Sequence, residues 1–142
     1  GLANAMNSLT DRKKLGKIRS KSVEKILLGM LSYPLLVAGN GRACSELMMA
    51  TDSPVIVKTG AEGVFVALLP EKRIGVALKI WDGSMRASEA AITLILIRLG
   101  VLSKDHPVAR TRLFSETKNW SGKVTGSISP TKRFWDSGKK II

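Results

Sequence analysis

The sequence contains one cysteine, Cys44, and one histidine, His106, among 142 residues. A single cysteine excludes a disulfide within the chain and fits a reducing compartment, so we expect a cytoplasmic protein. One cysteine and one histidine also cannot build a zinc site unaided. No apolar run reaches the ~18 residues that a membrane helix needs, and the first residues lack the pattern of a secretory signal. We therefore expect no association with a membrane.

Aromatic residues are few, at 5%, and 11 acidic residues stand against 23 basic ones. The resulting net charge of +12 permits a polyanion-binding module. We favour two solvated basic segments that flank a core. The scattered tryptophans offer no base-stacking platform, so nucleic acid is not the expected partner. The basic residues gather near the start (Lys13, Lys14, Lys17, Arg19, Lys21) and near the end (Lys132, Arg133, Lys139, Lys140).

The apolar pattern predicts a mixed fold. Apolar residues at helical spacing predict a helix over residues 20–33, which Pro34 ends, and a short helix is expected over 44–50. Runs rich in Val and Ile predict strands over 55–58, 63–69 and 73–80, with a further candidate over 122–128. Short connections make neighbouring strands antiparallel. The fold class is therefore α+β, an antiparallel sheet flanked by helices, with residues 1–14 and 131–142 peripheral.

The segment GSMRASEAAITLILIRLG predicts a longer helix, which Ser84 caps and Gly100 ends. Asp82 is expected to stabilise its N-terminus through the helix dipole, and Arg86 is expected to pair with Glu89. The residues predicted to face the sheet are Ala87, Ala90, Ala91, Leu94, Ile95 and Ile97.

Lys58 is the exception in an apolar strand. Burying a lysine there would be costly unless another group paired with it. A desolvated or hydrogen-bonded lysine can take or relay a proton. Thr59 places a hydroxyl beside it, and Gly60, which has no side chain, would let a ligand lie along the strand edge. The triplet can therefore handle an acyl group, although three residues alone favour the simpler interpretation, a strand-end lysine that reaches solvent.

A longer pattern surrounds this triplet. The stretches LVAGNGRACSELM, VIVKTGAEGVFVALLPEKRIGVALKIWDGSMRASEAAI and LIRLGVL together resemble the asparaginase II family, the rhizobial-type L-asparaginases, over residues 36–102. The resemblance implies a fold similar to the serine β-lactamases and penicillin-binding proteins, and hydrolysis of L-asparagine to L-aspartate and ammonia. It also implies a serine nucleophile in a Ser-x-x-Lys motif, opposite a Lys-Thr-Gly strand.

The resemblance assigns roles to several residues of this chain. Lys58 matches the lysine of the Lys-Thr-Gly strand and is the candidate catalytic residue, and Thr59 and Gly60 border the substrate. Cys44 matches a cysteine close to the substrate pocket, although a buried small hydrophobe is an equally good interpretation. From charge alone, Arg42 and Glu62 are candidates to bind the α-carboxylate and α-amine of L-asparagine.

The family's Ser-x-x-Lys motif lies in an N-terminal half that we do not find here. SVEK at Ser22 and SPTK at Ser129 have the spacing, but we interpret both as chance. We therefore expect residues 1–142 to be one partial domain, the C-terminal half of an asparaginase, inactive alone and partnered by a complementary N-terminal half. We expect no metal in this chain, with any zinc held by the other half, and we expect a homo-oligomer. The alternatives are a basic polyanion-binding module and an inactive truncated remnant.

Overall fold

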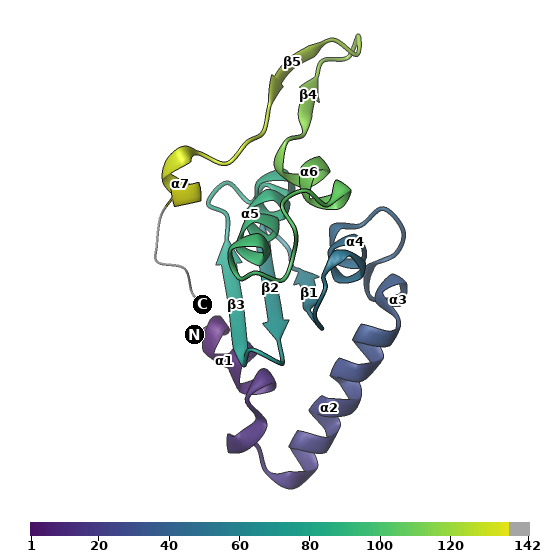
Figure 1. Cartoon of the computed structure of the whole chain (residues 1–142), viewed down its shortest axis with the longest axis vertical. Coiled ribbons are helices and arrows are strands. Elements are labelled where there is room, and N and C mark those ends of the chain that lie inside the picture. The colour runs from purple at the N-terminus through teal and green to yellow at the C-terminus, as the bar shows by residue number, and fades with distance from the viewer. Residues whose placement is uncertain (137–142) are drawn as a thin grey trace.

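The computed structural model describes residues 1–136, apart from the side chain of Lys14; residues 137–142, with Lys139 and Lys140 of the predicted basic end, lie outside the described residues. The α+β fold class is confirmed (Figure 1). In chain order the helices are α1 (Leu2–Thr10), the 3-10 turn η1 (Arg12–Lys14), α2 (Lys17–Ser32), α3 (Pro34–Ala38), α4 (Ala43–Ala50), α5 (Met85–Arg98), α6 (Pro107–Leu113) and α7 (Lys132–Asp136). The strands are β1 (Ile56–Thr59), β2 (Val64–Leu69), β3 (Ile74–Lys79), β4 (Glu116–Lys118) and β5 (Val124–Ser127).

The three predicted strands of the central region form one antiparallel sheet in the order β1-β2-β3. Their bounds agree with the sequence prediction to within about one residue at each end. Ile56 pairs with Leu68, and Val57 pairs with Ala67. Because side chains alternate along a strand, these two pairs lie on opposite faces of the sheet.

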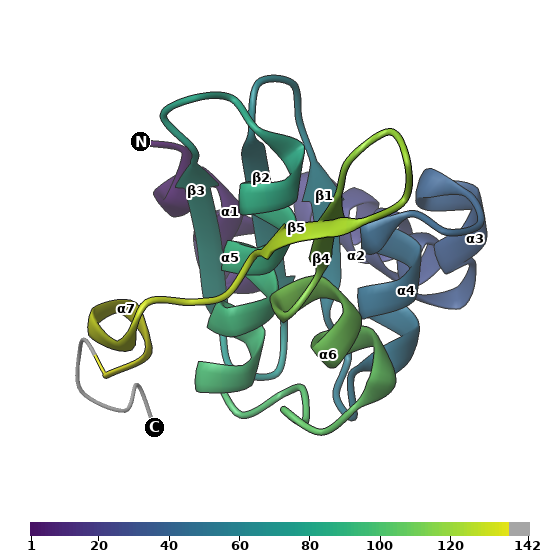
Figure 2. The same cartoon turned by 90° about the horizontal axis from the view of Figure 1, so that it is seen from above.

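Each face of the sheet has its own hydrophobic core. Val57, Phe65 and Ala67 join the larger core, together with residues of α4, α5 and α6. Ile56 and Leu68 join a smaller core beneath α1 and α2. Figure 2 shows this layering from above, with α5 and α6 on one side of the sheet and α1 and α2 on the other. The chain therefore buries apolar surface on both faces of a small sheet.

Helix α1 packs directly on β3, which corrects the prediction that residues 1–14 are peripheral. Gly75 allows this contact: a methyl carbon placed there would lie 2.1 Å from the backbone nitrogen of Asn7 and 2.6 Å from the carbonyl carbon of Met6. Met6 and Leu9 also pack against the smaller core. The apolar spacing that reveals longer helices is weak in a nine-residue helix, so the sequence did not indicate this role.

Helix α5 begins as predicted, because the Ser84 hydroxyl accepts a hydrogen bond of 3.3 Å from the backbone nitrogen of Ala87. The face predicted to contact the sheet is right only in part. Ile95 and Ile97 pack against the larger core as predicted, but Ser88, Ile92 and Leu96, which were not predicted, are fully buried. The other four predicted residues line a groove between α5 and the C-terminal segment: Ala87, Ala90, Ala91 and Leu94. Of these four, only Leu94 is fully buried.

Replacing Ser84 with alanine is expected to destabilise the protein by about 1 kcal/mol, because the first turn of α5 loses its side-chain acceptor. Ser84→Asp keeps an acceptor at the same position and should retain the stability. Urea unfolding of both variants, followed by circular dichroism, measures the difference. Equal stability of wild type and Ser84→Ala would show that this cap does not stabilise the helix.

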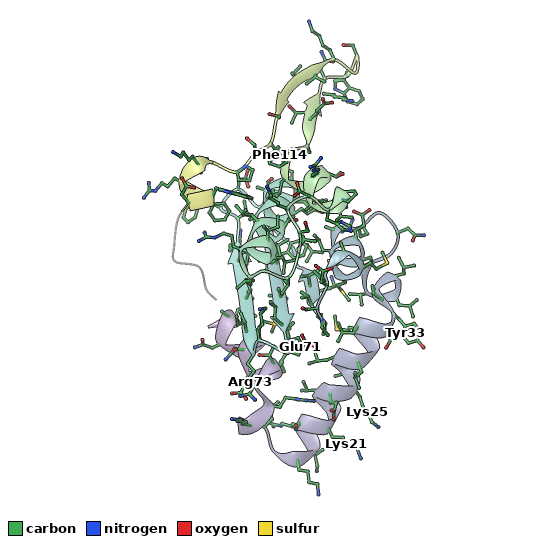
Figure 3. All side chains as sticks on the ribbon, in the orientation of Figure 1. Lys21, Lys25, Tyr33, Glu71, Arg73 and Phe114 are labelled. Atoms are coloured by element: carbon green, nitrogen blue, oxygen red, sulfur yellow. The ribbon has the colours of Figure 1, made fainter. Side chains whose placement is uncertain are left out.

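The C-terminal part forms a hairpin and a short helix. The predicted strand over 122–128 is confirmed as β5, and its antiparallel partner β4 was not predicted. Figure 1 shows the hairpin projecting from the end of the molecule opposite α2, and Phe114 lies where the chain leaves α6 to enter it (Figure 3). The residues of α7 are exposed.

Candidate functional site

Lys58 lies at the end of β1, which is an edge strand of the sheet. Of the two interpretations that the sequence left open, the structure has the strand-end lysine that reaches solvent and not the buried, paired one. The Lys58 side chain is exposed, and its Nζ donates a hydrogen bond of 2.8 Å to the carbonyl oxygen of Thr59. Lys58 lies on the same face of the sheet as Ile56 but outside the smaller core, so its side chain reaches solvent.

Cys44 and Thr59 are brought together. The backbone nitrogen of Thr59 donates a hydrogen bond of 3.2 Å to Cys44 Sγ. Cys44 is 1% exposed and lies in the first turn of α4, within the larger core. The thiol therefore has two roles: it packs as a small hydrophobe, and it fixes the strand end that carries Lys58 to α4. The first role is one of the two interpretations from the sequence, and the second was not predicted.

Gly60 and Glu62 form the turn that follows β1. The Gly60 nitrogen donates to the Val64 carbonyl at 2.8 Å, and a methyl carbon at Gly60 would lie 3.2 Å from Val64 Cβ. The absence of a side chain therefore serves the tight turn, where the sequence suggested room for a ligand. Glu62 is exposed and has a left-handed backbone, with φ of 54°.

The turn at Glu62 packs against the loop after β3. Gly63 and Gly83 both have φ of +72°, and a methyl carbon at Gly63 would lie 3.0 Å from the carbonyl carbon of Gly83. The Ile80 nitrogen also donates to the Gly63 carbonyl at 3.1 Å. This contact explains why glycine stands at positions 63 and 83, the ends of the stretches TGAEG and IWDG. It fixes the two loops at the same end of the sheet.

Lys58 borders an apolar groove of about 540 Å³ between β1, α2 and α3. Lys25 and Tyr33 also line it, and Figure 3 shows Lys25 on α2 and Tyr33 just past the end of that helix. Arg42 is exposed at the N-cap of α4, and neither Arg42 nor Glu62 lines this groove. The remaining lining residues are Ile26, Gly29, Met30, Leu36 and Val37.

Neither Ser-x-x-Lys sequence forms a site with Lys58. The Ser22 hydroxyl donates to the Ile18 carbonyl at 3.1 Å within α2, and only the Lys25 of that pair lines the groove. Ser129 lies in a different groove, against α5. The three tryptophans lie on separate elements: Trp81 follows β3, Trp120 is in the β4–β5 turn and Trp135 is on α7.

The described part of the chain contains neither a metal-binding cluster nor a membrane-spanning helix. No three His, Cys, Asp or Glu side chains within residues 1–136 gather as a metal ion would require, so these residues do not fit a zinc ion. Among the same residues, no helix has both the length and the apolar character needed to cross a membrane.

Sequence reasoning also missed a charged cluster. Glu89 pairs with Arg112, whereas Arg86 pairs with Asp82, so the predicted Arg86–Glu89 pair is wrong. Asp82 Oδ1 also accepts a hydrogen bond of 2.8 Å from the Ser84 nitrogen, in keeping with its predicted place at the start of α5. No local spacing signals Arg112, because its partner Glu89 is 23 residues away.

Comparison with known proteins identifies the family. A search of curated proteins gave no match. The family model described as L-asparaginase II matches residues 1–130, which include both core layers, the triplet Lys58-Thr59-Gly60, and Cys44. This match agrees with the resemblance seen in the motifs around that triplet. The chain therefore belongs to the L-asparaginase II family.

Proposed function

We propose that this chain supplies one wall of an active site that hydrolyses L-asparagine to L-aspartate and ammonia. The observation that supports this proposal most directly is the position of Lys58, exposed at an edge-strand end that Cys44 holds in place. The family match supports amide hydrolysis as the reaction class. In this proposal Thr59, Gly60 and Cys44 border the substrate, while Arg42 and Glu62 bind its α-carboxylate and α-amine.

The second wall, in this proposal, belongs to a complementary N-terminal half that carries the Ser-x-x-Lys motif. Its serine oxygen bonds to the side-chain amide carbon of L-asparagine, and the carbon–nitrogen bond breaks. Lys58 helps to relay the proton that leaves with ammonia. Water then hydrolyses the acyl ester, which releases L-aspartate and restores the serine.

Exposed apolar surface supports such a partner. Around the groove beside Lys58, large apolar side chains on α2 and α3 are 46–84% exposed: Ile26, Leu28, Leu35 and Leu36. A patch of this kind marks an interaction surface more often than a free surface. Tyr33, between the two helices, is 63% exposed and extends the same surface.

The open edge of β3 supports the same partner. Within the described sheet β3 pairs only with β2, so the backbone groups of its other edge have no strand beside them. Natural sheets usually cover or protect a six-residue edge that carries neither proline nor several charges. We propose that a strand of the complementary half extends the sheet here, giving the C-terminal portion of a serine β-lactamase-like fold. Any zinc ion would then be held by residues of that half.

Mixing the chain with a separately made N-terminal half of a family member tests this function. We expect the mixture to release ammonia and L-aspartate from L-asparagine in equal amounts, and each part alone to release neither. No product from the mixture, with both parts folded, would contradict the proposal. The chain would then be an inactive remnant or a polyanion-binding module, and binding that falls steeply with salt would identify the latter.

A further inference from the structure

We infer that Arg112 is a positioning residue for the candidate site, because its side chain fixes α4, and with it Cys44 and Arg42, relative to the end of β1. This inference rests on the proposed function for its importance to catalysis. The structural part of it concerns contacts within this chain alone.

Arg112 lies on α6 and reaches two other helices. Its Nη1 donates to Glu89 on α5, and its Nη2 donates to Glu46 on α4, each at 2.5 Å. The same Nη2 donates to the Gly41 carbonyl at 3.1 Å. One side chain therefore holds both the residue before Arg42 and the first turn of the helix that carries Cys44.

The cluster is partly shielded from water. The side chains of Arg112 and Glu89 are each 17% exposed, and that of Glu46 is 31% exposed. Burial opposes the charge of Arg112, but the hydrogen bonds and charges of Glu46 and Glu89 outweigh this effect and raise its pKa. The guanidinium is therefore charged at every pH at which the protein is used.

Stability alone does not explain this arrangement. Arg112 Nε is buried and has no hydrogen-bond partner within the described residues, and two carboxylates share one cation. Partly buried ion pairs often add little to stability, since desolvation offsets their attraction, but they define one geometry. Here the geometry defined is that of α4, and α4 in turn fixes Thr59 through the Cys44 thiol.

The contacts of α4 carry this effect to the site. The Glu46 nitrogen donates to the Arg42 carbonyl at 3.0 Å, and the Ser45 hydroxyl donates to the Pro34 carbonyl at 2.9 Å, which ties α4 to the start of α3. A shift of α4 would therefore move Arg42 and release the Thr59 amide, while β2 and β3 keep their own ladder.

Amide hydrogen exchange on the 142-residue chain tests the inference. Arg112→Met should raise exchange about tenfold or more at the amides of Glu46 and Thr59, while Phe65 on β2 is unchanged. Arg112→Lys keeps the charge but reaches fewer acceptors, so it should raise the exchange rates of the same amides by a smaller factor. This variant serves as the test if Arg112→Met does not fold. Unchanged exchange at Thr59, or an equal rise at Phe65, would overturn the inference.

Arg110→Met is the matched control. Arg110 lies on the same helix and pairs with Asp105 at 3.0 Å on the exposed surface, where its hydrogen bond and the charge of Lys104 lower the pKa of Asp105. Losing this pair should leave exchange at Thr59 unchanged, because neither residue contacts α4 through a hydrogen bond or ion pair.

Activity adds a second readout. In the mixture with the N-terminal half, Arg112→Lys should raise KM for L-asparagine more than it lowers kcat, because the residues it positions bind the substrate rather than attack it. A loss confined to kcat would overturn the positioning role. The exchange measurement does not depend on activity, so it tests the positioning role of Arg112 even if the mixture releases no ammonia. That second result would contradict the proposed function and not the role of Arg112.

Discussion

Replacing Lys58 with alanine is expected to lower kcat for L-asparagine by at least about 100-fold in the mixture of this chain with an N-terminal half. Proton transfer by a positioned side chain contributes roughly 10² to 10⁴ to a rate, and Lys58 is the one family-matched lysine at the candidate site. The fold should be unaffected, because the side chain is exposed and bonds only to its neighbour's carbonyl. Ammonia release under saturating L-asparagine measures the effect.

Lys79→Ala is the control for this experiment. Lys79 is the last residue of β3, as Lys58 is the last but one of β1, and it is also exposed. Its Nζ likewise donates to the next carbonyl, that of Ile80, at 2.5 Å. Removing it deletes the same charge and the same kind of local hydrogen bond, and activity should remain within about twofold because Lys79 does not line the groove beside Lys58. If both variants lost activity equally, the effect of Lys58→Ala would come from the loss of a positive charge in general and not from a role of Lys58 in the reaction.

Replacing Gly75 with alanine is expected to cost more than about 3 kcal/mol of stability, above the usual range for overpacked cores. The added carbon would lie 2.1 Å from the backbone nitrogen of Asn7, and backbone cannot move aside as the end of a flexible side chain can. Helix α1 would have to leave β3, exposing Met6 and Leu9 of the smaller core. Urea unfolding measures the loss.

Gly29→Ala provides the matched control. Gly29 lies within α2, and a methyl carbon there would meet no atom within 4 Å. Alanine is the better helix former, so this variant should gain up to about 1 kcal/mol. If Gly75→Ala were as stable as the wild type, α1 would not pack on the sheet as described.

The local parts of this fold could be predicted from the sequence. The breaks TGAEG and PEKR separate runs rich in Val and Ile, and each run became a strand within about one residue of its predicted bounds. The cap at Ser84 was also predicted, because capping depends on neighbours three residues apart. These features need no knowledge of distant segments.

Features that depend on distant segments could not be predicted in this way. The alanine face of α5 suits the sheet and the C-terminal segment equally well, and only the structure shows that Ala87 and Ala91 line the groove beside Phe134. Lys58 could be placed at a strand end, but the packing of distant helices on that face of the sheet decides whether its side chain is buried.

The charged cluster illustrates the same limit for the candidate site. Arg112 is 66 residues from Glu46 and 71 from Gly41, so no helical spacing links them. The link between Cys44 and the Thr59 amide likewise joins residues 15 apart across two elements. The sequence indicated the residue types of the site, whereas packing decides which of them meet.

The most direct test of the central claim is a titration of the N-terminal half into a fixed amount of this chain, with the rate of ammonia release from L-asparagine as the readout. The account predicts a rate that rises to a plateau at one N-terminal half per chain, and a plateau at least about 100-fold lower with Lys58→Ala. A rate that is zero at every ratio, or one that does not depend on this chain, would contradict it.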